Sequence, residues 1–131
     1  MKKLLILLFS LLISFNSYGE TKYEYYENGQ IKVEENYKND KLDGKATYWY
    51  ENGQKASEGN YKDGKMDGKW TWWYENGQIE AEENYKNDKL DGKATDWYEN
   101  GQKRSEGNYK DGKMDGKSTW WYENGQIQWE R

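Results

Sequence analysis

The sequence contains no cysteine, no histidine and no proline. Without cysteine the chain can form no disulfide, and it lacks the residue that carries the lipid of bacterial lipoproteins. Without cysteine and histidine it also lacks the usual pairs of nucleophile and base, and the common ligands of zinc. These absences disfavour most hydrolase and metalloenzyme classes. We therefore expect no enzyme, no metal site and no cofactor.

Long apolar runs are absent except at the N-terminus. Lys2 and Lys3 precede the apolar run 4–15, and Ser17 and Gly19 supply small residues before a cleavage point. This pattern is typical of a secretory signal peptide, residues 1–19. The run is too short for a spanning helix, which needs about 20 apolar residues. We expect an exported protein, periplasmic, secreted or at the cell surface, with no membrane binding after cleavage.

The remaining chain, residues 20–131, is acidic and poor in aliphatic residues. Losing Lys2 and Lys3 changes the net charge from −4 to −6, which disfavours binding to nucleic acid or anionic lipid. The same stretch holds only six Leu, Ile and Val, but it keeps all eight Trp and twelve of the thirteen Tyr. Because an aromatic side chain can bury about 150–250 Å², we expect a core made of rings.

The motif Tyr-Glu-Asn-Gly-Gln recurs every 24 residues from Tyr26 onward. It defines units 26–49, 50–73, 74–97 and 98–121 and a partial capping unit, 122–131. Units alternate between two types, which indicates duplication of a 48-residue block. In each unit a Trp also recurs just before the motif, and we call this series the Trp row: Trp49, Trp73, Trp97 and Trp121.

Each unit carries two turn signals. Asn-Gly, as at Asn52-Gly53, predicts a type I′ turn, and Asp63-Gly64 or Asn39-Asp40 predicts the second turn. Strands of about nine or ten residues rich in Tyr, Trp and Thr lie between them. The sequence therefore predicts an all-β fold: an elongated, single-sheet antiparallel meander of 24-residue β-hairpin repeats. The glycines expected at turns are Gly29, Gly53, Gly77, Gly101, Gly125, Gly44, Gly68, Gly92 and Gly116.

Pairing across the turns gives a testable register. Around Asp63-Gly64 we expect Tyr61 opposite Met66, Glu58 opposite Lys69 and Ser57 opposite Trp70. The corresponding pairs around Asn39-Asp40 are Tyr37 with Leu42 and Glu34 with Lys45, and those around Asn76-Gly77 are Tyr74 with Ile79 and Trp72 with Ala81.

Alternation along the strands predicts two unlike faces. The packed face carries most rings and aliphatics, among them Tyr37, Tyr48, Tyr61, Trp70, Trp72, Tyr85, Ile31, Ile79 and Ile127. The opposite face carries Glu and Lys together with the Trp row. The row is a candidate binding surface for sugar rings or a protein partner. The alternative, which we favour, is that the row covers the second face of the sheet or forms a homodimer contact.

Carboxylates remain as candidates for chemistry. Glu34, Glu58, Glu82 and Glu106 recur with the repeat, each predicted to face a lysine, and a reactive site rarely appears four times in one sheet. Calcium would need six to eight oxygens, whereas Lys41 and Lys65 interrupt the acidic turns. Turn chemistry explains these residues without a metal. The two edge strands are a further option for a partner strand, and the charges of Glu130 and Arg131 favour capping.

The segment Gly59-Asn-Tyr-Lys-Asp-Gly-Lys-Met-Asp-Gly-Lys69, followed by Trp-Thr-Trp-Trp-Tyr-Glu-Asn-Gly, resembles the bacterial variant of the MORN repeat. The resemblance covers nearly all of residues 20–131. It implies glycines at tight turns and close strand approaches, and aromatics that pack an elongated antiparallel sheet. Glu35 and Glu83 depart from the pattern, since Gly59 and Gly107 stand there in the other unit type.

The resemblance also implies a function: MORN-type repeats serve as interaction and scaffold modules. We therefore expect a non-enzymatic scaffold that binds a protein partner in the cell envelope or extracellular space. The alternatives are carbohydrate or cell-wall binding through the aromatic ladder, and a YwqK-type toxin-neutralising antitoxin.

Overall fold

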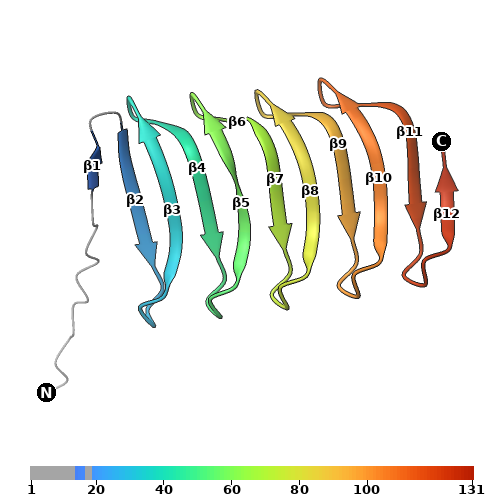
Figure 1. The fold of residues 1–131 in the computed structure, drawn as a ribbon, viewed down its shortest axis with the longest axis horizontal. Coiled ribbons are helices and arrows are strands. Elements are labelled where there is room, and N and C mark those ends of the chain that lie inside the picture. The colour runs from blue at the N-terminus through green and yellow to red at the C-terminus, as the bar shows by residue number, and fades with distance from the viewer. Residues whose placement is uncertain (1–13, 17–18) are drawn as a thin grey trace, which may run out of the picture.

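The computed structural model describes residues 14–16 and 19–131, and in this part of the chain all regular structure is strand (Figure 1). The strands form one open antiparallel sheet in the order β1-β2-β3-β4-β5-β7-β8-β9-β10-β11-β12, with the short β6 paired to β5. The predicted all-β meander is confirmed. The strands are β1 (Ser14–Asn16), β2 (Gly19–Tyr25), β3 (Ile31–Lys38), β4 (Lys41–Trp49), β5 (Lys55–Lys62), β6 (Lys65–Met66), β7 (Gly68–Trp73), β8 (Ile79–Lys86), β9 (Lys89–Trp97), β10 (Lys103–Lys110), β11 (Lys113–Trp121) and β12 (Ile127–Glu130).

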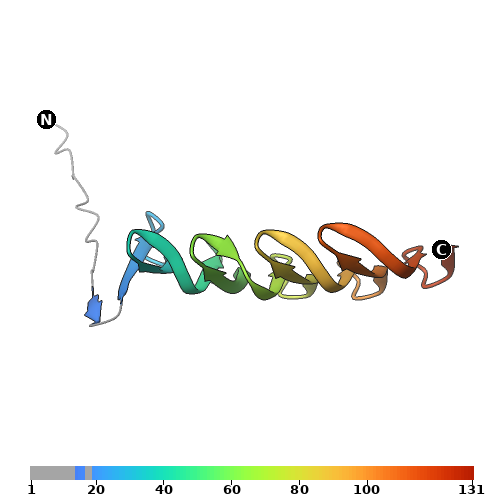
Figure 2. The ribbon, with the colours of Figure 1, turned by 90° about the horizontal axis from the view of Figure 1, so that it is seen from above.

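The sheet is a single layer, as the view from above shows (Figure 2). Each strand therefore packs against its two neighbours and against no second sheet or helix among the described residues. Burial is correspondingly rare. The buried hydrophobic residues are Ala46, Trp70, Ala81 and Ala94. The predicted aromatic core exists as a half-covered layer of rings on one face of the sheet.

Two different turns alternate along the sheet. Asn39 and Asp40 both have positive φ (50° and 60°), as do Asp63 and Gly64 (49° and 82°), which confirms type I′ turns there. The prediction of a type I′ turn at each Asn-Gly pair was wrong. In the loop after Tyr50 only Gly53 has positive φ (86°), and Gly53 N–H donates to the Tyr50 carbonyl at 3.0 Å. Such a three-residue loop with glycine in the left-handed region also satisfies an Asn-Gly sequence.

A two-residue offset lies beyond each type I′ turn. Tyr61 pairs with Met66 as predicted, whereas Glu58 pairs with Thr71 instead of Lys69. Likewise Ser57 pairs with Trp72 instead of Trp70. The extra residues sit around Gly68, whose φ of 87° favours glycine. Because the offset is two residues, Trp70 and Trp72 keep the same face as Tyr61. The same offset shifts Glu34, which pairs with Thr47 rather than Lys45, while Tyr37 and Leu42 pair as predicted.

A one-residue bulge lies beside each Asn-Gly loop. Trp72 pairs with Ala81 as predicted, but the residue opposite Ile79 is Trp73, not Tyr74. A one-residue shift moves a side chain to the other face. The prediction that Ile31, Ile79 and Ile127 lie on the packed face was therefore wrong, since these three residues pair with Tyr25, Trp73 and Trp121.

The predicted signal peptide falls mostly outside the described residues. Of residues 1–19 the structure describes 14–16, which form β1 alongside β2, and Gly19. Cleavage after Gly19 and export stay predictions. In the described part of the chain no helix long and apolar enough to cross a membrane is present.

Candidate binding surfaces

The Trp row lies where alternation predicts it, on the face opposite Trp70 and Trp72. All four of its side chains are half-buried. Their backbone carbonyls accept hydrogen bonds from the tyrosine that opens the preceding loop: Tyr50 Oη donates to Trp73 O at 2.8 Å, and Tyr74 Oη to Trp97 O at 2.7 Å. These bonds join each unit to the next. The backbone of the row thus links the units, while its side chains stay partly accessible.

Intervening strands place a smaller side chain between successive tryptophans. Lys55 pairs with Trp49, and its Nζ lies 5.8 Å from the centre of the Trp73 ring, within range of a cation–π contact. Lys103 makes the same contact with Trp121, whereas Ile79 stands opposite Trp73. Tryptophans of the row therefore alternate with lysine or isoleucine. The rings do not form one continuous aromatic surface.

Ion pairs border the Trp row on this side, which we call the charged face. Lys45 contacts Glu58 at 3.2 Å and Lys69 contacts Glu82 at 2.7 Å. Glu and Lys do pair across strands, but with the neighbour on the other side from the one predicted, because of the two-residue offset. Burial alone would raise the pKa of Glu58, and hydrogen bonds from Lys55 and Lys45 outweigh it and hold that pKa below its usual value.

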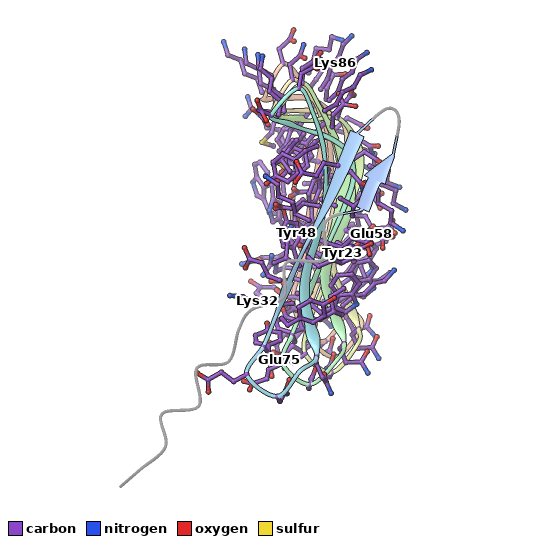
Figure 3. The ribbon with its side chains drawn as sticks, turned by 90° about the vertical axis from the view of Figure 1, so that its left-hand side faces the viewer. Tyr23, Lys32, Tyr48, Glu58, Glu75 and Lys86 are labelled. Atoms are coloured by element: carbon purple, nitrogen blue, oxygen red, sulfur yellow. The ribbon has the colours of Figure 1, made fainter. Side chains whose placement is uncertain are left out.

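The opposite side carries a group of rings, and we call it the aromatic face: Tyr37, Tyr48, Tyr61, Trp70, Trp72 and Tyr85. The end view shows Tyr48 on one side of the sheet and Tyr23 and Glu58 on the other (Figure 3). Ring centroids lie 5.1 Å apart for Tyr61 and Trp70, 5.7 Å for Trp70 and Trp72, and 6.1 Å for Trp72 and Tyr85. These separations suit edge-to-face and stacked contacts. Trp70 is 2% exposed, and the other rings are half-buried.

One carboxylate is set among the tyrosines at the N-terminal end of this face. Glu35 accepts hydrogen bonds from Tyr37 Oη and Tyr48 Oη, both at 2.6 Å. The hydrogen bond to Glu35, together with burial, raises the pKa of Tyr37 to about 12. Burial, followed by the hydrogen bond to Glu35, raises the pKa of Tyr48 as well. The two hydroxyls therefore stay protonated and hold the carboxylate in place.

Further along the sheet, on β8 and β9, the same face is more polar. Glu83 accepts a hydrogen bond from Tyr85 Oη at 2.6 Å, and Asp96 stands where the first block has Tyr48. Burial, with the charge of Asp96 adding to it, raises the pKa of Glu83 despite the Tyr85 hydrogen bond. Arg104 approaches Asp96 at 4.0 Å. The first block thus sets one carboxylate between two tyrosines, whereas the second block sets two carboxylates near Tyr85.

The profile of the MORN repeat variant family matches the chain five times, at residues 21–39, 42–63, 66–87, 90–111 and 114–128. These segments cover most of the sequence. The chain belongs to the MORN repeat variant family. A comparison with curated proteins finds no match. Each complete MORN match begins in a strand that follows a type I′ turn and ends close to the next such turn, so one match spans two strands and an Asn-Gly loop.

Within the MORN units, residues at loops and at strand faces behave differently. The loop hydrogen bond from the motif tyrosine recurs in four successive units, from Tyr26 to Tyr98. The aromatic face varies instead: one position carries Tyr48, Trp72, Asp96 and Trp120 in turn. The loop hydrogen bonds are thus the same in every complete unit, whereas the side chains on the aromatic face differ from unit to unit.

The MORN scaffold brings together residues that the sequence analysis did not single out as a site. Glu35 and Glu83 were noted only as departures from glycine, and Asp96 and Arg104 were not noted. The available signal was Asp96, an acidic residue at the position that holds Tyr48, Trp72 and Trp120 in the other units. None of the described residues form a group of three or more acidic side chains able to hold a metal ion.

Proposed function

We propose that this MORN-variant protein is a non-enzymatic scaffold that binds a protein partner through its aromatic face, in the cell envelope or the extracellular space. MORN repeats are generally scaffolds that are often involved in binding. The observation that carries the proposal is the uncovered ring cluster. A single-layer sheet leaves Tyr61, Trp72 and Tyr85 half-buried, and ring contacts through Trp70 join them into one surface. Contiguous apolar surface that stays partly accessible marks interaction sites.

The composition of the aromatic face supports a protein partner. Trp and Tyr are the residues enriched at the centres of protein interfaces, where they supply large contact areas at low entropic cost. Glu35 is already held by Tyr37 and Tyr48, so the face needs little reorganisation on binding. The envelope location is supported by the leader-like pattern of the first 19 residues alone.

Adjacent tryptophans on opposite faces allow a matched test. Trp72 lies on the aromatic face and Trp73 in the Trp row, and both are half-buried. Trp72→Ala and Trp73→Ala proteins are used as bait in crosslinking pull-downs from an envelope fraction. Thermal unfolding of each variant confirms that the bait is folded. We expect an identified partner to be lost with Trp72→Ala, weakening by about tenfold or more, and retained with Trp73→Ala. Equal loss in both variants, or retention in both, contradicts the proposal.

Carbohydrate binding is the second candidate, favoured by the regular spacing of the Trp row. Successive members are two strands apart, about 10 Å, and keep part of each ring accessible. Intrinsic fluorescence titrated with envelope glycans distinguishes the two functions. A saturable change that is lost in Trp73→Ala and kept in Trp72→Ala supports sugar binding by the row. An unchanged spectrum together with a partner dependent on Trp72 supports the scaffold.

A further inference from the structure

Two series of side-chain hydrogen bonds, from a tyrosine hydroxyl and from an asparagine amide, join each unit to the next and stop at the C-terminal edge. Tyr98 Oη donates to Trp121 O at 2.8 Å, and Asn100 Nδ2 donates to Glu123 O at 3.0 Å. Tyr122 and Asn124 hold the same loop positions one unit later. No described strand follows β12 to accept their hydrogen bonds. The last hairpin therefore presents the donor half of an interface that the sheet already makes four times.

The apolar side chains of this edge are uncovered in the same way. Among the described residues, the large hydrophobic side chains classed as exposed are Met114 (40%), Tyr122 (50%), Ile127 (56%) and Trp129 (48%), and all belong to the last hairpin. Their counterparts within the sheet are half-buried, as Ile79 is for Ile127, or buried, as Ala81 is for Trp129, because another strand lies beside them. The edge thus lacks a neighbour that interior strands have.

The backbone of β12 is also available. Arg131 and Ser118 exchange two hydrogen bonds of 2.9 Å, so Arg131 faces β11. In an antiparallel ladder the adjacent residue points the other way, and the N–H and C=O of Glu130 are directed to the open edge. The Glu130 side chain lies over Lys117 and Thr119, at 3.3 Å from each, and leaves that edge clear. By the same alternation Tyr23 of β2 directs its backbone away from β3.

We propose that the N-terminal hairpin of a second copy of this chain adds to the C-terminal edge, so that copies join head to tail in one continuous sheet. The occupant follows from the repeat. β12 is the next member of the series that contains β10, and β2 belongs to the series that contains β11. A β12–β2 junction therefore repeats the β10–β11 pairing. In that register Trp129 faces Glu24, Glu130 faces Tyr23 and Arg131 faces Lys22.

The same junction would continue both series of side-chain hydrogen bonds into the second copy. The hydroxyl of Tyr122 reaches the carbonyl of Tyr25 in the second copy, in the way that Tyr98 reaches Trp121. The amide of Asn124 reaches the carbonyl of Glu27, as Asn100 reaches Glu123. β1 pairs with Gly19 to Thr21 on the same edge of β2 that the junction uses at residues 22–25, so the junction is proposed for the protein cleaved after Gly19, which lacks β1. Because the two edges differ, the contact is heterologous and the assembly is open.

A proline at the edge tests the junction without removing a hydrogen bond inside the sheet. Glu130→Pro deletes the outward N–H and places a ring in the path of the incoming strand. Glu130→Ala removes the same side chain and keeps the N–H. We expect the mean mass of the wild-type protein that starts at Glu20, measured by sedimentation over a concentration series, to rise to about twice the monomer mass or beyond. Glu130→Ala should follow the wild type, and Glu130→Pro should stay monomeric while keeping the wild-type circular dichroism.

Mixing two blocked proteins distinguishes a head-to-tail contact from a symmetric dimer. Tyr23→Pro blocks the other edge, and Tyr23→Ala is its control. Each proline variant alone should be monomeric. Their mixture should reach about twice the monomer mass and no more, because one intact edge of each kind remains. The proposal is overturned if Glu130→Pro associates like the wild type, if the mixture stays monomeric, or if the wild type shows no concentration-dependent mass.

Discussion

The two 48-residue blocks have the same backbone fold and differ in the side chains that pack on its aromatic face. In the first block Gly59 lies beneath Trp70, so closely that a Cβ on the glycine would be 2.2 Å from the indole. In the second block Gly107 lies beneath Ser118, and the same Cβ would be 2.7 Å from Oγ. Trp70 anchors the ring cluster, whereas Ser118 is 1% exposed with a hydroxyl that has no hydrogen-bond partner. The blocks therefore share their turns and differ in the packing of the aromatic face, and we expect them to contribute unequally to stability.

The largest difference between the blocks should appear on truncating these two side chains. Trp70→Ala removes the most buried ring of the aromatic face and should lower the free energy of unfolding by about 3–5 kcal/mol. Ser118→Ala removes an unpaired buried hydroxyl and should change that free energy by less than about 1 kcal/mol in either direction. Chemical denaturation of both variants measures the contrast. Equal losses would show that the blocks are equally packed.

A smaller effect is expected at the glycines beneath them. Gly59→Ala forces the Trp70 ring to move and should destabilise by about 1–3 kcal/mol. Gly107→Ala meets a serine side chain that can rotate away, and it should cost less than Gly59→Ala. Thermal unfolding of the pair provides the measurement. A larger loss for Gly107→Ala would contradict the account of tight packing in the first block.

Sequence patterns predicted the turns and the strand pairs that recur in every unit, but they missed the shifts in pairing register between those pairs. The type I′ turns and the pairs Tyr61–Met66 and Trp72–Ala81 followed from turn chemistry and alternation. The turn type at Asn52-Gly53 did not, because asparagine followed by glycine suits two hairpin geometries. Bulges add unpaired residues that leave no periodic signal, so the face of Ile79 and the partner of Glu58 were missed. The position of the Trp row was predictable, whereas Glu83 and Asp96 meet only through the register.

The smallest effect concerns Glu83, which lacks the second tyrosine that Glu35 has. Asp96→Tyr restores that tyrosine and removes the neighbouring charge, and it should stabilise the protein at neutral pH by about 0.5–1.5 kcal/mol. A carboxyl whose folded pKa is raised stabilises the fold below its unfolded pKa and loses this contribution as pH rises through the folded value. In the wild type part of the stability is therefore lost as pH rises from about 4. Denaturation from acid to neutral pH should show a smaller loss in Asp96→Tyr, and an unchanged slope would refute this origin.

Contact restricted to nearest neighbours makes the length of this ribbon adjustable. Because strands pair only with strands that lie beside them in the sheet, adding or deleting a 48-residue block preserves every type of strand interface. Each 24-residue unit advances the chain by two strand spacings, about 10 Å. The length of the sheet therefore scales with the number of repeats, and a longer or shorter gene changes that length without changing any type of contact.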